Sequence, residues 1–306
     1  MRAAEAPGPA PRQVGDNRRR MPHARPLRVV SSHLFCNQRL HTAVLDRLAA
    51  SGADGVEVFC ARQSFDWRQP AQLEALAAWF RDHELQLHSL HGPIYTDESW
   101  GRSGEPPLDI AHPDRRRRLP AVEEVERVLE LAEVLPFRYL IQHLGAGGDD
   151  ESPARSEAAF SSLERLSMLA KRAGVGLVVE NTPNALATPA NLVEFFAATH
   201  LDDIGICFDA GHAHLPGYLL GGGGVAASWE LLAPRVVTTH LHDNLGQKDD
   251  HLWPGEGGIP WADCMPRLAA RPEVPWVLEI TSHPADPATF SQLRVTWDRL
   301  AAWAGA

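Results

Sequence analysis

The stretch GLVVENTPNALATPANLVEFFAATHLDDIGICFDAGH, residues 176–212, contains a complete strand–helix–strand unit. Its first and last parts, 176–183 and 203–212, hold short runs of apolar and β-branched residues, which are typical of buried strands. Between them, 191–200 has apolar residues spaced as on one face of a helix. A strand, a crossover helix and a second strand together predict a parallel pair of strands.

The same unit repeats along the chain from residue 27. The predicted strands are 27–35, 55–59, 85–92, 138–145, 176–183, 203–212, 235–244 and 276–282. The clearest helices between and after them are 71–83, 121–135, 156–174, 191–200 and 287–302. Eight strands alternating with helices predict an α/β fold of the (β/α)8 (TIM) barrel type, for which about 250 residues is a typical length.

A doubly wound open sheet is the alternative arrangement of alternating strands and helices. The glycine-rich turn GxGxxG, which often marks a dinucleotide-binding sheet, would follow the first strand. Residues 31–38 read SSHLFCNQ instead. The sequence therefore favours the barrel, as a single domain over residues 27–306.

The first residues of the chain differ in composition from the rest. Residues 1–26 are dominated by Pro, Ala and Arg, and no apolar run follows the arginines as it would in a secretory or twin-arginine signal. We therefore expect a disordered tail over 1–26, ahead of the barrel. Met21 lies shortly before the first strand and is a second candidate for the start of translation.

The charge of the chain argues against a general affinity for nucleic acid. Residues 1–28 carry seven arginines and a net charge of +5, so the whole-chain value of −10 leaves −15 on residues 29–306. Nonspecific binding to a phosphate backbone depends mainly on Lys and Arg, so this acidic body is not expected to bind nucleic acid.

Apolar runs and cysteines indicate the compartment. No run approaches the roughly 18 apolar residues of a membrane-spanning helix, so no membrane partner is expected. The four cysteines are far apart and form no CxxC pair, which fits a reducing environment. We therefore expect a cytoplasmic protein.

Polar side chains interrupt the apolar strands near their carboxyl ends. These residues are His91, His143, Glu180, Asp209, His212, His240 and Glu279. In a barrel those ends meet on one face, where active sites lie. A single such residue is most often a hydrogen-bonded structural group or a helix cap. Three acids and four histidines together would crowd like charges, which a divalent cation relieves, so the set predicts a site for Mn, Zn, Co or Mg.

The loop HDNLGQKDDHLWPGEGGIPW, residues 242–261, follows the seventh strand and holds further candidates. Asp249 and His251 are two residues apart and could face one ion if the segment is extended. Trp253 and Lys248 are candidate substrate-binding residues in the same loop, although a tryptophan more often only packs. His242 is a further candidate for supporting the ligands.

The motifs VVENTP, FDAGHAH, THLHDN, DDHLWPGEGGIPW and VLEI, in this order, resemble those of the xylose isomerase-like barrel superfamily. The resemblance covers essentially all of residues 27–303. It extends to two branches of that superfamily. One holds sugar and sugar-phosphate isomerases and epimerases, and the other holds apurinic/apyrimidinic endonucleases of the endonuclease IV type.

Resemblance to the isomerase branch implies one divalent metal held by Glu180, Asp209, His240 and Glu279. The metal would polarise a carbonyl and stabilise an enediolate, while Glu180 or Glu279 takes a proton from carbon and the other returns it. His212 would then hydrogen-bond substrate oxygens as a third catalytic residue. The implied partner is a small carbohydrate, and a homo-oligomer remains open.

Resemblance to the endonuclease branch implies three zinc ions and nine ligands. The matching residues are His91, His143, Glu180, Asp209, His212, His240, Asp249, His251 and Glu279. The acidic body argues against this branch, and the one internal basic run, Arg115–Arg118, is expected to precede a helix as a solvated face.

Two further observations weigh on these alternatives. Some epimerases carry an arginine shortly after the strand-seven histidine, but this chain has only Lys248 before the PGEG turn, so phosphorylation of the substrate stays open. A non-catalytic barrel would be expected to have lost ligands, whereas the metal quartet is complete. We therefore expect a metal-dependent isomerase or epimerase first, and an endonuclease-like phosphodiesterase second.

Overall fold

A computed structural model describes residues 25–146, 152–216 and 224–305 of the 306-residue chain. The tail predicted over 1–26 therefore lies almost entirely outside the described residues. At its end, the Arg25 guanidinium already pairs with the Asp54 carboxylate at 2.7 Å. Within the described segments, no helix combines the length and the apolar character that crossing a bilayer requires.

Eight parallel strands form a barrel, as the sequence predicts. The strands are β1 (Arg28–Ser31), β2 (Gly55–Phe59), β3 (Gln86–His91), β4 (Tyr139–Gln142), β5 (Gly176–Glu180), β6 (Gly205–Asp209), β7 (Val236–His240) and β8 (Trp276–Leu278). They pair in the order β7-β6-β5-β4-β3-β2-β1-β8. The barrel closes between its outer members, because Leu241 and Leu278 form a parallel bridge and Leu241 N–H donates to Val277 O at 2.7 Å.

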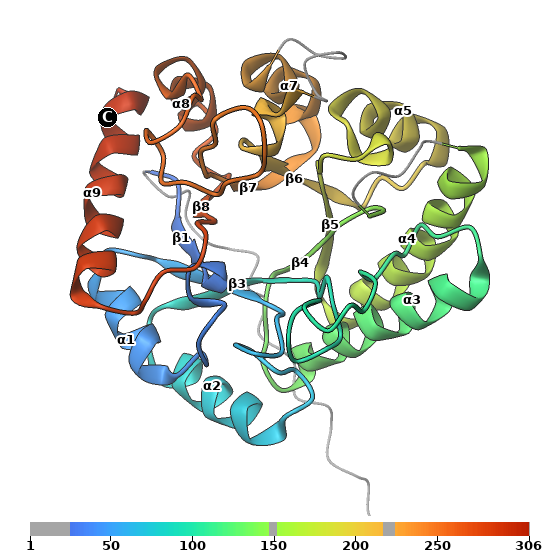
Figure 1. Cartoon of the computed structure of the whole chain (residues 1–306), viewed down its shortest axis with the longest axis horizontal. Coiled ribbons are helices and arrows are strands. Elements are labelled where there is room, and N and C mark those ends of the chain that lie inside the picture. The colour runs from blue at the N-terminus through green and yellow to red at the C-terminus, as the bar shows by residue number, and fades with distance from the viewer. Residues whose placement is uncertain (1–24, 147–151, 217–223, 306) are drawn as a thin grey trace, which may run out of the picture.

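A ring of helices surrounds the strands (Figure 1). The α-helices of the described residues are α1 (Thr42–Ala50), α2 (Pro70–Asp82), α3 (Arg115–Glu130), α4 (Pro153–Ala173), α5 (Pro189–Thr199), α7 (Val225–Leu232), α8 (Trp261–Ala269) and α9 (Pro287–Ala304). The five predicted helices are confirmed. The sequence did not identify α1, α7 and α8, which have only eight or nine residues, too few for an unambiguous apolar period.

The basic run Arg115–Arg118 corrects one prediction. It does not precede α3 but forms its first turn, and it is largely exposed there, as a solvated face should be. The helix begins early because the Asp114 side chain accepts a hydrogen bond from Arg116 N–H. Pro120 is accommodated inside the helix, which therefore begins six residues before the predicted start at residue 121.

The register of the sheet places polar strand ends side by side above an apolar floor. Asp209 on β6 pairs with His240 on β7. Val178 lies two residues before Glu180 on β5, so both side chains face the barrel interior. Val178 forms a small buried cluster with Ile141 and Cys207, separate from the main core between strands and helices. Charged groups above this floor are therefore held in an apolar environment.

The long connection from β7 to α8 folds around the buried Asp243 carboxylate. It accepts hydrogen bonds from the backbone N–H groups of Asn244, Gly255 and Ile259, and from Trp261 Nε1 at 2.8 Å. At Gly257 a Cβ atom would lie only 2.3 Å from Asp243 Oδ1, so the backbone approaches too closely for any other residue. This carboxylate fixes the loop that carries Asp249 and His251.

We expect Asp243→Ala to lower the free energy of unfolding by about 3 kcal/mol or more, because several buried donors lose their acceptor and each costs roughly 1–3 kcal/mol. Chemical denaturation measures this change. The matched control is Asp202→Ala, whose side chain is 79% exposed beside Arg235 and should cost less than about 1 kcal/mol. Equal small losses in both variants would contradict the proposed role of Asp243.

Candidate metal centre

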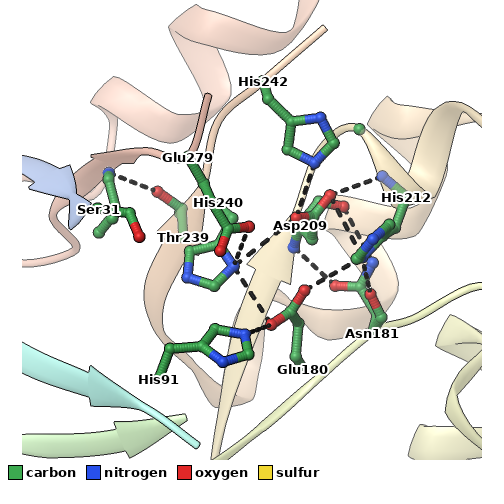
Figure 2. Close-up of polar contacts among 12 residues, drawn as sticks. Ser31, His91, Glu180, Asn181, Asp209, His212, Thr239, His240, His242 and Glu279 are labelled. Carbon is green, nitrogen blue, oxygen red and sulfur yellow. Dashed lines mark hydrogen bonds and ion pairs between the residues drawn. The ribbon is translucent and has the colours of Figure 1, made fainter. Parts of the chain in front are cut away.

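Glu180, the last residue of β5, lies at the centre of a buried polar cluster (Figure 2). Its Oε2 atom is 3.3 Å from His91 Nε2, 3.3 Å from His143 Nε2 and 3.2 Å from His240 Nδ1. Its Oε1 atom is 3.1 Å from His212 Nδ1. One carboxylate thus contacts the ends of β3, β4 and β7 at once.

The four residues of the predicted metal quartet meet around His240 Nδ1. This nitrogen lies 3.2 Å from Glu180 Oε2, 3.2 Å from Glu279 Oε2 and 3.7 Å from Asp209 Oδ2. Ligand atoms about 2.1 Å from a tetrahedral cation would be about 3.4 Å apart, so these separations fit one bound ion. Glu180, Asp209 and His240 are completely buried, and Glu279 is 3% exposed.

Several of the converging atoms have no well-formed hydrogen bond. Within the described part of the chain, both carboxylate oxygens of Glu180 and Nδ1 of His240 are buried without a partner of acceptable geometry. Buried polar atoms are normally satisfied, and three orphans that point at one another require an explanation. Coordination of a divalent cation satisfies all three, so the residues fit such an ion.

The electrostatics of the cluster keep the acids ionised. Burial alone would raise the pKa of Glu180, but the nearby imidazoles of His240 and His143 hold that pKa well below its usual range. Burial would likewise lower the pKa of His240, but Glu279, Glu57 and Glu180 raise it well above the ordinary value. The carboxylates and imidazoles of the cluster therefore stabilise one another's charged forms.

A second group lies beside the first and contains His212, His242, Asp249 and His251. Asp249 Oδ2 is 3.0 Å from both His212 Nε2 and His251 Nε2. His242 Nε2 lies 3.0 Å from Asp209 Oδ2, which joins this group to the quartet. The structure thus brings together all nine residues that the endonuclease resemblance implies, and it adds His242.

Three imidazoles are oriented by backbone carbonyl groups. Their Nδ1 atoms lie within 2.9 Å of carbonyl oxygens, in the pairs His91–Gly92, His212–Asn181 and His251–Glu279. A carbonyl oxygen can only accept, so each Nδ1 carries the hydrogen. Once such a ring gives up its second proton, its Nε2 atom can bind a cation among the carboxylates.

A cavity of about 210 Å³ opens beside the second group. Its polar lining comes from Tyr95, Gln142, His143, Thr182, Asn184, His212 and Asp249. None of the described lining residues is Lys or Arg. A larger cavity of about 490 Å³, around Arg25, Asp54 and Gln86, is lined by none of the candidate ligands. The smaller cavity is therefore the candidate substrate site.

The two predicted substrate-binding residues are not part of the described cavity lining. Lys248 has an 81% exposed side chain whose Nζ lies 3.0 Å from Asp250 Oδ1. Trp253 is buried in the core, with its ring 5.5 Å from that of His283. A role for either in substrate binding remains a prediction.

Sequence reasoning missed Glu57 and Asp243. Glu57 lies in the middle of β2, completely buried, with Oε1 3.0 Å from His240 Nε2. A carboxylate between two valines of GVEVF was the available signal, since buried barrel strands are otherwise apolar. Asp243 follows His242 directly and reads as an ordinary loop residue, so its role in the loop gave no comparable signal.

Comparisons with known proteins agree with the barrel fold. The sequence pattern of a family described as "Xylose isomerase-like TIM barrel" matches residues 45–300. An uncharacterized protein of Methanocaldococcus jannaschii is 26% identical over 246 residues, which is 78% of this chain and 78% of that protein.

Two solved structures are similar in fold. A D-tagatose 3-epimerase-like protein superposes with a TM-score of 0.72 at 23% identity, over 90% of this chain and 97% of that one. The IOLI protein, solved with a zinc atom, has a TM-score of 0.68 at 14% identity, over 91% and 98% of the two chains. At these identities the likeness is one of fold.

We expect metal binding to release protons. The pKa of His240 and that of His212 are raised well above the ordinary value by nearby carboxylates despite burial, so both rings hold a proton more readily than a free imidazole before a cation binds. Titration calorimetry of Zn²⁺ into metal-free protein, in buffers of different ionisation enthalpy, should show about one or more protons released per ion and weaker binding as pH falls. A buffer-independent enthalpy would contradict this expectation.

Proposed function

Because this chain belongs to the xylose isomerase-like TIM barrel family, we propose that it is a divalent-metal-dependent sugar isomerase or epimerase. The observation that carries the proposal is the convergence of Glu180, Asp209, Glu279 and His240 on one buried point. The similar epimerase-like and zinc-containing structures support both parts of the proposal.

The chemistry is proton transfer next to a carbonyl group. A cation held by the quartet would polarise the carbonyl of a bound ketose or aldose. Glu279 and Glu180 then serve as the acid–base pair, one taking a proton from the adjacent carbon and the other returning it. Glu279 is best suited to meet the substrate, because it is the one quartet residue with any exposed surface.

His212 serves as the third catalytic residue in this proposal. Its ring is 4% exposed and lines the cavity, and its Nδ1 atom lies 2.9 Å from Asn181 O, which fixes its orientation. In a mononuclear enzyme it hydrogen-bonds a substrate oxygen beside the quartet. Apolar barrel walls around these groups strengthen such electrostatic contacts.

The cavity lining supports an uncharged sugar as the first substrate class to test. Tyr95, Gln142 and Thr182 offer hydroxyl and amide groups, which suit the hydroxyl groups of a sugar. A phosphate group is generally held by Arg, Lys or a helix N-terminus, and the described lining offers neither cation. Free ketoses and aldoses therefore come before their phosphate esters.

The second group of ligands favours one alternative function. With His212, Asp249 and His251 also binding metal, the cluster would resemble a polynuclear phosphodiesterase centre that acts on abasic DNA. Such a cluster supplies an activated hydroxide and stabilises the leaving oxygen. The acidic body of the chain opposes this alternative.

We expect Glu180→Gln and Glu279→Gln to lower turnover by at least about 100-fold, because each removes one member of the acid–base pair. Incorporation of deuterium from D₂O into a panel of free sugars, followed by NMR, reports the proton transfer directly. Melting temperatures confirm that the variants fold. Normal deuterium incorporation in both variants would eliminate the proposed mechanism.

Asp249→Ala distinguishes the two functions. If the enzyme uses the quartet alone, the substitution should lower sugar exchange far less than the Glu180 and Glu279 variants do, because it removes only a contact to His212 at the cavity. It should abolish cleavage of abasic-site DNA if a polynuclear centre acts. Asp250→Ala is the matched control and should leave both activities unchanged. Asp250 pairs with Lys248 and belongs to neither ligand group.

A further inference from the structure

His240 is held differently from the other imidazoles of the centre. His91, His212 and His251 each turn Nδ1 to a backbone carbonyl, and their Nε2 atoms lie within 3.3 Å of a carboxylate of Glu180 or Asp249. His212 Nδ1 also lies 3.1 Å from Glu180 Oε1. His240 does the reverse. Its Nε2 atom lies 3.0 Å from Glu57 Oε1, and its Nδ1 atom faces Glu180 and Glu279.

Glu57 is fixed for this contact by the sheet itself. It lies opposite Ser89 in the register of β2 with β3, and Ser89 Oγ donates to Glu57 Oε2 at 2.7 Å. Glu57, Ser89 and His240 are all completely buried. The three side chains thus form a relay of buried hydrogen bonds that runs from Ser89 on β3 through Glu57 on β2 to His240 on β7.

The relay opposes a tautomer that would block metal binding. With two carboxylates in front of Nδ1, a neutral His240 would otherwise favour a hydrogen on Nδ1, donated to Glu180 or Glu279. An ionised carboxylate behind the ring can only accept, so it favours the hydrogen on Nε2 instead. The Nδ1 lone pair then faces the point where the quartet converges.

We propose that Glu57 is a positioning residue that makes His240 an Nδ1 metal ligand, an inference that rests on the metal binding of the proposed function. Glu57 lies behind the imidazole ring and acts through it. A purely structural role would instead be limited to neutralising a buried histidine, and it would change stability without changing metal affinity.

The experiment measures Zn²⁺ affinity by competition with a chromophoric chelator, using full-length metal-free protein. We expect Glu57→Leu to weaken the binding by about 10- to 100-fold, the usual effect of losing a group that orients a ligand. Glu57→Gln should weaken it less, because its amide oxygen can still accept from Nε2–H while its NH₂ group faces Ser89. The same variants in an Asp249→Ala background isolate the quartet from the second group.

Glu124→Gln is the matched control. Glu124 is also buried, accepts from Trp67 Nε1 at 2.7 Å and belongs to neither ligand group. It should lower stability and leave Zn²⁺ affinity unchanged. If Glu57→Leu does not fold, the two single variants Glu57→Gln and Ser89→Ala test the proposal instead. Each preserves the packing of the barrel and should weaken Zn²⁺ binding.

The outcomes separate this inference from the function on which it rests. Zn²⁺ binding by the wild type with unchanged affinity in the Glu57 variants would overturn the positioning role alone. A loss of affinity as large in Glu124→Gln would overturn it as well. A wild type that binds no Zn²⁺ would overturn both proposals.

Discussion

The rest of the centre depends on buried negative charge that meets around one imidazole. Glu57 approaches His240 from behind, and Glu180, Asp209 and Glu279 approach it from the front. Four carboxylates in an apolar barrel repel one another strongly unless positive charge lies among them. The raised pKa values of His212 and His240 favour such charge in the protein alone, and a divalent cation would supply it in the proposed enzyme.

This constraint explains why so many elements contribute to a small volume. The apolar floor formed by Ile141, Val178 and Cys207 removes water from below the carboxylates. Asp243 folds the β7–α8 loop so that Asp249 and His251 close the cluster from above. The barrel thus provides the preorganised charges, and the loop adds Asp249 and His251 to them.

The barrel and the nearness of the strand-end residues were predictable from the sequence. The carboxyl ends of parallel strands meet on one face, so Glu180, Asp209 and His240 had to lie close together once the strands were identified. Short helices such as α7 were missed, because eight residues carry too little periodicity.

The roles of Glu57 and Asp243 were not predictable in the same way. Glu57 acts across the barrel, from β2 to β7, and only the closed barrel brings it to His240. Asp243 binds backbone groups up to 16 residues away in a loop without a repeating pattern. Lys248, predicted from the sequence as a substrate-binding residue, lies with its Nζ 3.0 Å from Asp250 Oδ1, and its role in binding stays a prediction.

The fold alone does not select between the two functions. A set of carboxylate and imidazole ligands can hold one ion for proton transfer or several ions for phosphodiester cleavage. The quartet is common to both chemistries. The second group around Asp249 is the structural feature that distinguishes them, since His212 and Asp249 line the cavity while His212 and His242 also contact Glu180 and Asp209 of the quartet. In the proposed function, His212 would contact substrate if this group holds no ion, and metal if it does.

Anomalous diffraction from crystals soaked in Mn²⁺ or Zn²⁺ tests the central claim most directly, because it locates each ion independently of any assay. Our account predicts a strong peak within coordination distance of Glu180, Asp209, His240 Nδ1 and Glu279. A peak only elsewhere on the protein, or none at saturating metal, would contradict a metal centre at this end of the barrel.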